Sequence, residues 1–467
     1  MKILLINVPY IFELYKESTI PLGIAYIASN LRQSHTVKIL DMNIEKVTRT
    51  DFIKLLCDFK PDLAGFSVKT PTQPLCNELA HLIKETNPDI KIVFGGPQPT
   101  ACPEELTQDV DYAVIGEGEK TILELADTIE KNKNPMHVSG ISFKSHNRII
   151  ITKPREAIST LDEIPFPSFD LFPTEKYTGC GFRNGFYMIT SRGCPYSCTY
   201  CSAHLTFGKK VRRRSIKNVI QELSGLIEKY YIKWIVFDDD VFTLDRNYCA
   251  NLCKEIISQK MDITWWCNTR VDRVDEKLLE IMHKAGCEQI SYGIESGSER
   301  ILSMIKKGTN VQQAYEAVKS TRKAGIVPSG YFMVNFPSEK MDEIQSTIDL
   351  AKTIGVTYFR ISMAIPYPKT DMWEQCSNDK ILPTSLENYA YLNNIIIHNP
   401  EVDAAKLRKK IVAANVRMFL RSVWFSDSAR IWLKSLMKTK NLHIPLFNVL
   451  SYYKNLRSFN SHEYLFK

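Results

Sequence analysis

The feature that most constrains the fold of this chain is a regular alternation of short apolar strands with amphipathic helices, which occurs twice. The first run extends from Lys2 to about residue 130, and the second from Phe186 to Ile361. Strands that alternate with helices pair in parallel, because each helix carries the chain back across the sheet. The sequence therefore predicts an α/β protein with two parallel sheets, and 467 residues are enough for two or three domains.

The first run is typical of a doubly wound sheet. Its expected strands are 2–6, 37–40, 63–68, 91–94 and 112–115, and its expected helices include 21–31, 52–59 and 75–86. Two strands end in glycine-rich segments, at 95–97 and 116–118. Ligands of such sheets bind at the carboxyl ends of the strands, and glycine lets a large ligand approach the backbone closely. A ligand site is therefore expected at these two segments.

The second run contains six expected strands. They are 186–190, 234–237, 263–266, 289–293, 327–334 and 356–361, with helices at 215–230, 246–259, 275–284, 311–324 and 341–354 between them. As in the first run, polar residues at the strand ends are the candidates for a functional site.

Three cysteines follow the first of these strands within eight residues. Cys194, Cys198 and Cys201 are separated by gaps of three and two residues, too tight a run to join distant parts of a fold by disulfides. Thiolates at this spacing suit an iron–sulfur cluster or zinc. Three protein ligands leave one position open, as reactive metal sites require. A zinc site completed by His204 is the alternative.

The order Cys194-x-x-x-Cys198-x-x-Cys201 after an apolar strand resembles the signature of the radical S-adenosylmethionine enzymes. The resemblance implies a partial (β/α)6, TIM-like barrel and a [4Fe-4S] cluster whose fourth iron chelates S-adenosylmethionine. One electron, from a reductant such as a flavodoxin or ferredoxin, would cleave the sulfonium to a 5′-deoxyadenosyl radical. Tyr200 lies where this family places an aromatic residue beside the adenine.

Charged residues close the second and third strands of this run. Asp238 and Asp239 belong to three adjacent carboxylates, which repel one another unless a cation is near. The ammonium and sulfonium of S-adenosylmethionine would serve, and a solvated acidic turn is the alternative. Arg270 could bind the methionyl carboxylate as a fork, or it could pair with Asp272.

The fourth and fifth strands end in segments that resemble nucleoside-binding motifs of the same family. Glu295 and Ser296 match residues that contact the nucleoside, and a carboxylate can accept hydrogen bonds from two ribose hydroxyls. Asn335 stands in the adenine motif where the family usually has glycine, and Lys369 replaces a glycine after the sixth strand.

Placed before such a barrel, the first domain resembles the Rossmann-like cobalamin-binding domain of the largest class of these enzymes. The resemblance implies cobalamin contacts from Pro21, Gly23, Ser67, Gly95, Gly96, Gly116, Glu117 and Gly118. Many cobalamin domains supply an axial histidine from an Asp-x-His-x-x-Gly loop, whereas this loop reads Asp41-Met-Asn43. Cobalamin would then bind without a histidine ligand, and a domain that binds no cofactor is the alternative.

These patterns predict four regions: a cobalamin-binding domain at 1–135, a linker at 136–182, the barrel at 183–375 and a helical, basic C-terminal region at 376–467. Prolines between 161 and 169 indicate an extended linker. From residue 401 onward, thirteen Lys and Arg against four Asp and Glu give +9, so the other 400 residues sum to −1. We expect helices at 406–424 and 429–440, which would form a lid that closes the barrel and contacts the first domain. Peripheral membrane contact is the alternative, and no binding to nucleic acid is expected.

The number of cysteines and the first residues of the chain predict the cellular compartment of the protein. Twelve cysteines without a secretory segment predict a reducing cytoplasm. The apolar run at 2–6 is too short for a signal core, and no stretch approaches the length of a membrane span.

Together these features predict a cobalamin-dependent radical S-adenosylmethionine enzyme. By analogy with the class, it would be a C-methyltransferase that acts on a small-molecule, lipid or peptide substrate, in biosynthesis of a specialised metabolite, lipid or tetrapyrrole. A ring-forming, oxygenating or rearranging enzyme of the same architecture is the first alternative. A transfer-RNA methylthiotransferase is the second, although Cys57, Cys76 and Cys102 do not stand in that family's contexts. A non-enzymatic cobalamin or metal sensor is the third.

Overall fold

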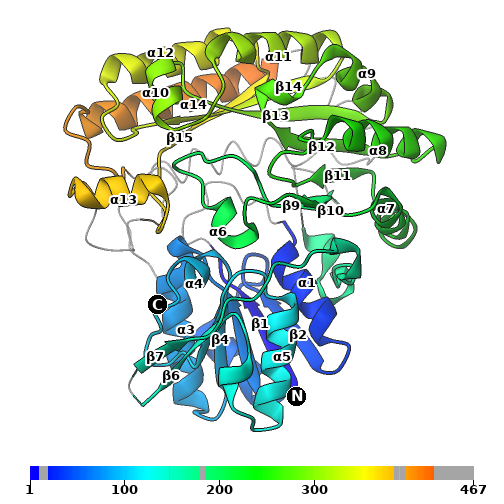
Figure 1. Ribbon diagram of the computed structural model, residues 1–467, viewed down its shortest axis with the longest axis vertical. Helices are drawn as coiled ribbons and strands as arrows, with labels where there is room; N and C mark the ends of the chain where they lie inside the picture. The colour runs from blue at the N-terminus through cyan, green and yellow to red at the C-terminus, as the bar shows by residue number, and fades with distance from the viewer. Residues whose placement is uncertain (10–18, 147, 178–184, 383–388, 390–394, 425–467) are drawn as a thin grey trace.

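The chain folds into two α/β domains that lie end to end (Figure 1). This computed structural model describes residues 1–9, 19–146, 148–177, 185–382, 389 and 395–424. The loop that carries the three cysteines and helix α6 (Ala203–Phe207) lies between the two domains (Figure 1).

The N-terminal domain is built on a seven-stranded sheet of order β2-β1-β3-β4-β5-β6-β7. Its strands are β1 (Lys2–Asn7), β2 (Thr36–Asp41), β3 (Leu63–Ser67), β4 (Lys91–Gly95), β5 (Tyr112–Val114), β6 (Ile141–Ser145) and β7 (Arg148–Ile151). The first five are parallel, which confirms the doubly wound sheet. Helices α1 (Leu22–Leu31) and α5 (Glu119–Glu130) share one apolar core, and α2 (Arg49–Phe59) and α3 (Gln73–Thr86) pack in another.

The boundary expected at residue 135 is too early. Strands β6 and β7 form an antiparallel hairpin, and β6 pairs with the edge strand β5, so the sheet extends to Ile151. Ile141 and Phe143 of β6 belong to the same core as α1 and α5. The sequence here shows two short apolar segments, 141–143 and 149–151, separated by polar residues, and nothing local indicates that the first of them pairs with β5.

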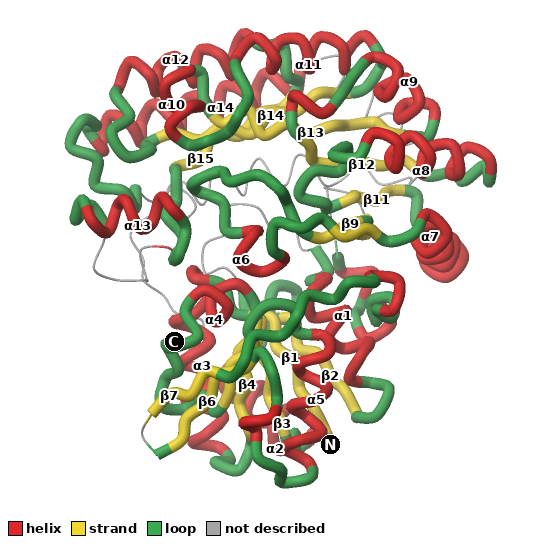
Figure 2. Tube along the Cα trace, viewed as in Figure 1, coloured by secondary structure: helices red, strands yellow, loops and turns green. Residues whose placement is uncertain are grey.

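The second domain is an open barrel of six parallel strands in the order β15-β14-β13-β12-β11-β8. These are β8 (Gly185–Met188), β11 (Trp234–Phe237), β12 (Thr264–Thr269), β13 (Cys287–Glu295), β14 (Val327–Val334) and β15 (Tyr358–Met363). Helices α7 (Ile216–Tyr230), α8 (Arg246–Ser258), α9 (Glu276–Lys284), α11 (Val311–Lys323) and α12 (Met341–Thr353) lie outside the strands (Figure 2). The six expected strands are thus all confirmed.

The edge strand β15 is covered by helix α14 (Ala404–Trp424). The Asn415 amide accepts a hydrogen bond from Ile361 N and donates one to Ile361 O, so it pairs with backbone groups of that strand. The expected helix at 406–424 is therefore present, and it joins the outer helical layer rather than covering the N-terminal domain (Figure 1). The helix expected at 429–440 lies outside the described residues. Within the described part of the chain, no helix combines the length and apolarity needed to span a bilayer.

Candidate active site

The cysteine loop is held in place by backbone hydrogen bonds. Thr199 N donates to Ile305 O at 3.0 Å, and Met372 N donates to Thr199 O at 2.9 Å. These bonds place the loop between the end of α10 (Glu299–Met304) and the start of α13 (Asp371–Asn378). Cys194, Cys198 and Cys201 are all half-buried, and burial raises the pKa of Cys201 to about 11.

The three thiols do not form a compact single-ion site. A tetrahedral zinc ion with Zn–S bonds of about 2.3 Å brings its sulfurs to about 3.8 Å from one another. Among the described residues, His35, Asp127 and Glu130 form a group of three possible metal ligands whose ligand atoms lie within 4.8 Å of one another. The three cysteine sulfurs form no such group, so their arrangement does not favour the zinc alternative.

Gly193 precedes the first cysteine and adopts a left-handed φ of 93°. A Cβ at this position would lie 2.5 Å from Lys210 O, and a backbone carbonyl cannot easily move away. We expect Gly193→Ala to lower the free energy of unfolding by about 1–3 kcal/mol and to reduce the iron bound after reconstitution. Iron analysis and urea unfolding measure these two effects.

Gly208 provides a matched control, because its φ of 73° is also left-handed but a Cβ there would meet nothing within 4 Å. Gly208→Ala is expected to lower stability by about 1 kcal/mol and to leave the iron content unchanged. Equal iron loss in both variants would contradict the steric explanation for Gly193.

The acidic residues after β11 have separate roles. Asp239 is 2% exposed and accepts hydrogen bonds from Thr190 N and Oγ1 and from Ser191 Oγ. This prediction needs correction, since the carboxylate holds the start of the cysteine loop instead of facing a ligand. Asp238 is exposed to the space between the domains, and Asn268 Nδ2 donates to it at 3.4 Å.

Asp238 is expected to make stability depend on pH. Although Asp238 is exposed, the protein atoms that surround its carboxylate desolvate it in part. This desolvation, and then the charges of Asp239 and Asp240, raise the pKa of Asp238 from 3.8 to about 7. Between these values the folded protein keeps a proton that the unfolded chain has released, so this contribution to stability decreases as pH rises. Urea unfolding of the apoprotein at about pH 5 and about pH 8 should show a smaller pH effect in Asp238→Asn than in the unsubstituted protein. Identical pH effects would contradict the raised pKa.

Arg270 pairs with Asp272, one of the two alternatives that its sequence context suggested, and its contact with the methionyl carboxylate stays a prediction. Its Nε and Nη2 donate to Asp272, at 2.8 and 3.3 Å, and its guanidinium stacks 3.7 Å from the centre of the Tyr196 ring. Nη1 is buried and has no hydrogen-bond partner among the described residues. Asp272 thus orients the guanidinium and occupies the fork formed by its Nε and Nη2.

Glu295 forms a buried ion pair with a residue that the sequence did not single out. Lys307 Nζ lies 2.8 Å from Glu295 Oε1, both side chains are at most 7% exposed, and Nζ lies 3.4 Å from Tyr200 Oη. Burial and the Glu295 carboxylate raise the pKa of Tyr200. A Cβ on Gly293 would overlap both charged groups, at 2.6 and 2.9 Å, so this glycine makes room for the pair. The pair thus joins the strand end to the cysteine loop.

Two predicted nucleoside contacts are occupied within the protein. Ser296 is fully buried, where its Oγ lies 3.1 Å from Thr347 Oγ1 and accepts from Ser298 N. Asn335 is also fully buried and donates to Ile397 O. The φ of Asn335 is 66°, in the left-handed region that glycine and asparagine tolerate best. This explains why asparagine can stand where the family motif usually has glycine. Both side chains have partners within the protein, and the nucleoside contacts expected at these two strand ends stay predictions.

The predicted cobalamin contacts lie at the strand ends that face the barrel. Gly96 has a φ of 101°, and a Cβ there would lie 2.9 Å from Val68 O; Ser67 and Gly95 end the two adjacent strands. Pro21 caps α1, and Gly23 in its first turn is exposed with open space around it. Gly116 has a φ of 77° and contacts α6, because a Cβ there would lie 4.0 Å from Thr206 O.

A cavity of about 220 Å³ lies where these strand ends meet the barrel. Lys69 and Pro97 line it from the N-terminal domain, and Thr206 and Tyr367 line it from the barrel. Apolar side chains and a few polar groups, among them Lys69 and Thr206, make up the lining, and such a mixture is typical of pockets for organic ligands.

Glu117 does not face this cavity. Its carboxylate is buried and binds Arg192, Arg212 and Ile158 N. Although burial opposes ionisation, the hydrogen bonds from Arg212 and Ile158 hold the pKa of Glu117 below its ordinary value. Gly118 lies close to α1, because a Cβ added to Gly118 would be 3.0 Å from Ile27 Cδ1. The predicted cofactor contact of Glu117 is therefore replaced by a structural one.

The loop that supplies an axial histidine in many cobalamin domains is closed by a tyrosine. Asn43 donates to Asp41 Oδ1 through its backbone and its side chain, and Asn7 donates to the same oxygen. Tyr177 of the connector is 1% exposed and donates to Asp41 Oδ2 at 2.7 Å. A corrin bound here would be held by strand ends and not by an imidazole of this loop.

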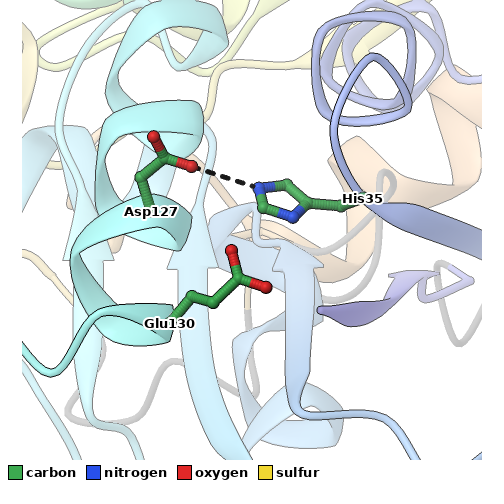
Figure 3. A group of neighbouring side chains, drawn as sticks. All are labelled: His35, Asp127 and Glu130. Atoms are coloured by element: carbon green, nitrogen blue, oxygen red, sulfur yellow. Dashed lines mark ion pairs between the residues drawn. The ribbon is translucent and has the colours of Figure 1, made fainter.

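His35, Asp127 and Glu130 form another group of possible metal ligands, within the N-terminal domain (Figure 3). The Met1 ammonium lies 2.8 Å from Glu130 Oε1, and Lys131 Nζ lies 3.3 Å from Asp127 Oδ2. Because the two carboxylates already have cationic partners, we assign no metal there.

Two family models match the chain in the order of its domains. The B12 binding domain matches residues 11–126, and the Radical SAM superfamily matches residues 188–351. An uncharacterized methyltransferase of Pyrococcus horikoshii is 37% identical over 86% of this chain and 88% of its own length. An anaerobic magnesium-protoporphyrin IX monomethyl ester cyclase of Rubrivivax gelatinosus is 26% identical over 86% and 74%.

A solved structure has the same arrangement of domains. OxsB, a cobalamin-dependent S-adenosylmethionine radical enzyme, matches 98% of this chain and 71% of its own chain with a TM-score of 0.71 and 20% identity. At this identity the likeness concerns the fold. Both family models and the 37% identical relative indicate one family. The half-buried cysteine loop and the glycines at the strand ends are consistent with that family. The chain belongs to the radical S-adenosylmethionine enzymes that carry an N-terminal B12-binding domain.

Proposed function

We propose that this enzyme transfers a methyl group to an unactivated carbon of a small organic substrate bound between its two domains. The observation that carries the proposal is a cavity lined by Lys69 and Pro97 of the B12-binding domain and by Ser202 and Thr206, which directly follow the cysteines. A substrate there would be near both halves of the machinery that such a transfer needs.

The residues present fit the expected cofactors. When bound, the cluster supplies the electron that cleaves S-adenosylmethionine, and the corrin supplies a methyl carrier. Cys194, Cys198 and Cys201 would hold the cluster, and Arg270 Nη1 would donate to the methionyl carboxylate. Glu295, oriented by Lys307, would accept from the nucleoside.

The relatives favour methylation over ring closure. The relative named as a methyltransferase is 37% identical, and the relative named as a cyclase is 26% identical over the same share of this chain. Ring closure is therefore the second candidate. The proposed substrate is a small molecule, and lipids and peptides are further substrate classes. The proposed reductant is a flavodoxin or a ferredoxin.

The methylthiotransferase alternative is not supported by the placement of its cysteines. Cys57 is exposed on α2. Cys76 belongs to α3 and faces the core, and burial raises the pKa of Cys76 to about 12. Thiols that point into a core and onto a surface cannot converge on a second cluster.

The test uses the full chain, reconstituted anaerobically with iron, sulfide and hydroxocobalamin, with dithionite as reductant. S-adenosylmethionine with a trideuterated methyl group is supplied together with a small-molecule extract of the producing cells. We expect 5′-deoxyadenosine, S-adenosylhomocysteine and one extract component that gains the labelled methyl group. A component that loses hydrogen without gaining label would favour ring closure, and absence of bound corrin would overturn the proposal.

A further inference from the structure

The segment before the first cysteine is bound to the B12-binding domain through buried charges. Arg192 lies two residues before Cys194, in strand β9 (Ser191–Arg192). Its Nη1 lies 3.2 Å from Glu117 Oε1, and its Nη2 lies 2.5 Å from Glu119 Oε1. The two carboxylates come from the turn after β5 and the first turn of α5.

Arg212 completes the network from strand β10 (Arg212–Arg213), which pairs with β9. Its Nη1 donates to Glu117 Oε2 at 2.8 Å and to Ile158 O at 2.7 Å, and Ile158 N donates to Glu117 Oε2. The four charged side chains are 4–7% exposed. We call Arg192, Arg212, Glu117 and Glu119 the interdomain latch.

Aromatic rings enclose the central guanidinium of the latch. The Arg192 guanidinium lies 5.4 Å from the ring centres of both Tyr26, on α1, and Phe207, on α6. An arginine in this position can be displaced only by breaking a two-carboxylate fork and two ring contacts together. The latch therefore defines one orientation of the cysteine loop relative to α1 and α5.

The latch also adjoins a predicted cofactor segment. Gly116 directly precedes Glu117, and a Cβ added to Gly116 would lie 4.0 Å from Thr206 O of α6. Two carboxylates and two guanidinium groups balance in charge, yet burying four charges stabilises a fold poorly compared with apolar packing. Such a network is better explained by the specific geometry that it imposes than by stability.

We propose that the interdomain latch is a positioning device that sets the distance between the corrin-binding strand ends and the cysteine loop, with Arg192 and Glu119 as its main positioning residues. The inference rests on the presence of both cofactors in this family, and it does not require that the substrate be methylated. Cleavage of S-adenosylmethionine depends on the barrel alone. Methyl transfer from S-adenosylmethionine to cob(I)alamin depends on the geometry between the domains, so the latch should affect the second reaction more.

The test compares Glu119→Gln and the milder Arg192→Lys, which keeps the charge but loses the planar fork. Glu85→Gln is the control, because Glu85 pairs with Arg49 on the exposed surface of the same domain. Without substrate, each reconstituted variant is assayed for 5′-deoxyadenosine, and for S-adenosylhomocysteine formed with reduced, bound cobalamin. Calorimetry of the cluster-free and corrin-free protein gives a readout independent of activity.

We expect both latch variants to form S-adenosylhomocysteine about tenfold more slowly while 5′-deoxyadenosine formation changes less than about threefold. We also expect the single calorimetric transition to broaden or divide, since the domains become less coupled. The control should leave all three measurements unchanged. An equal loss of both products, or no change in either, would overturn the positioning role. Failure of the methylation proposal would leave these measurements intact, because none of them uses a substrate.

Discussion

Cys198→Ser is expected to abolish 5′-deoxyadenosine formation and to lower the iron content after reconstitution well below four per chain. Cys198 is half-buried on the loop between the two domains, and only three cysteines lie on that loop. A cluster held by three thiolates has no spare protein ligand, and serine is a poor ligand for iron in this setting. Iron and sulfide analysis, the visible spectrum and product formation measure the effect.

Cys57→Ser provides the control, because Cys57 is an exposed thiol on α2 in the other domain. It should keep full iron content and full product formation. Urea unfolding of the two apoproteins should agree within about 0.5 kcal/mol, since neither substitution removes a buried apolar contact. An active Cys198→Ser enzyme would remove the central assignment of the site.

Lys307→Met is expected to lower the free energy of unfolding by about 3–5 kcal/mol, because it leaves the Glu295 carboxylate buried without its cation. Lys307 Nζ and Glu295 Oε1 are 2.8 Å apart, and both side chains are at most 7% exposed, so water cannot replace the lost cation. The neighbouring Tyr200 would lose its contact with the same ammonium group. Urea unfolding of the apoprotein measures the effect.

The adjacent lysine is a matched control. Lys306 pairs with Asp371 at 2.8 Å, and both side chains are more than half exposed. Lys306→Met should lower stability by at most about 1 kcal/mol. The double variant Lys307→Met with Glu295→Gln should recover part of the loss, because no ionised group then remains buried. A Lys307→Met variant as stable as Lys306→Met would show that Glu295 is stabilised by other groups.

Much of the fold could be read from local patterns. The expected strands at 234–237 and 327–334 coincide with β11 and β14, because fully buried parallel strands are short apolar runs between helices. The hairpin at β6 and β7 was not recognised, since its pairing with β5 depends on a strand about thirty residues earlier. The sequence offered little reason to single out Lys307. Its local marks are the glycine that follows it, Gly308, and a motif carboxylate nearby.

By itself, the sequence determined where the chain alternates between strand and helix, which three thiols share one loop, and where glycine permits left-handed backbone, as at Gly96 and Gly193. These features depend on neighbours within a few residues. Only the tertiary structure decided that Glu117 binds Arg192, 75 residues away, instead of a cofactor. The physical reason is that a buried charge takes the partner that domain docking brings within hydrogen-bond distance, and local spacing carries no record of that docking.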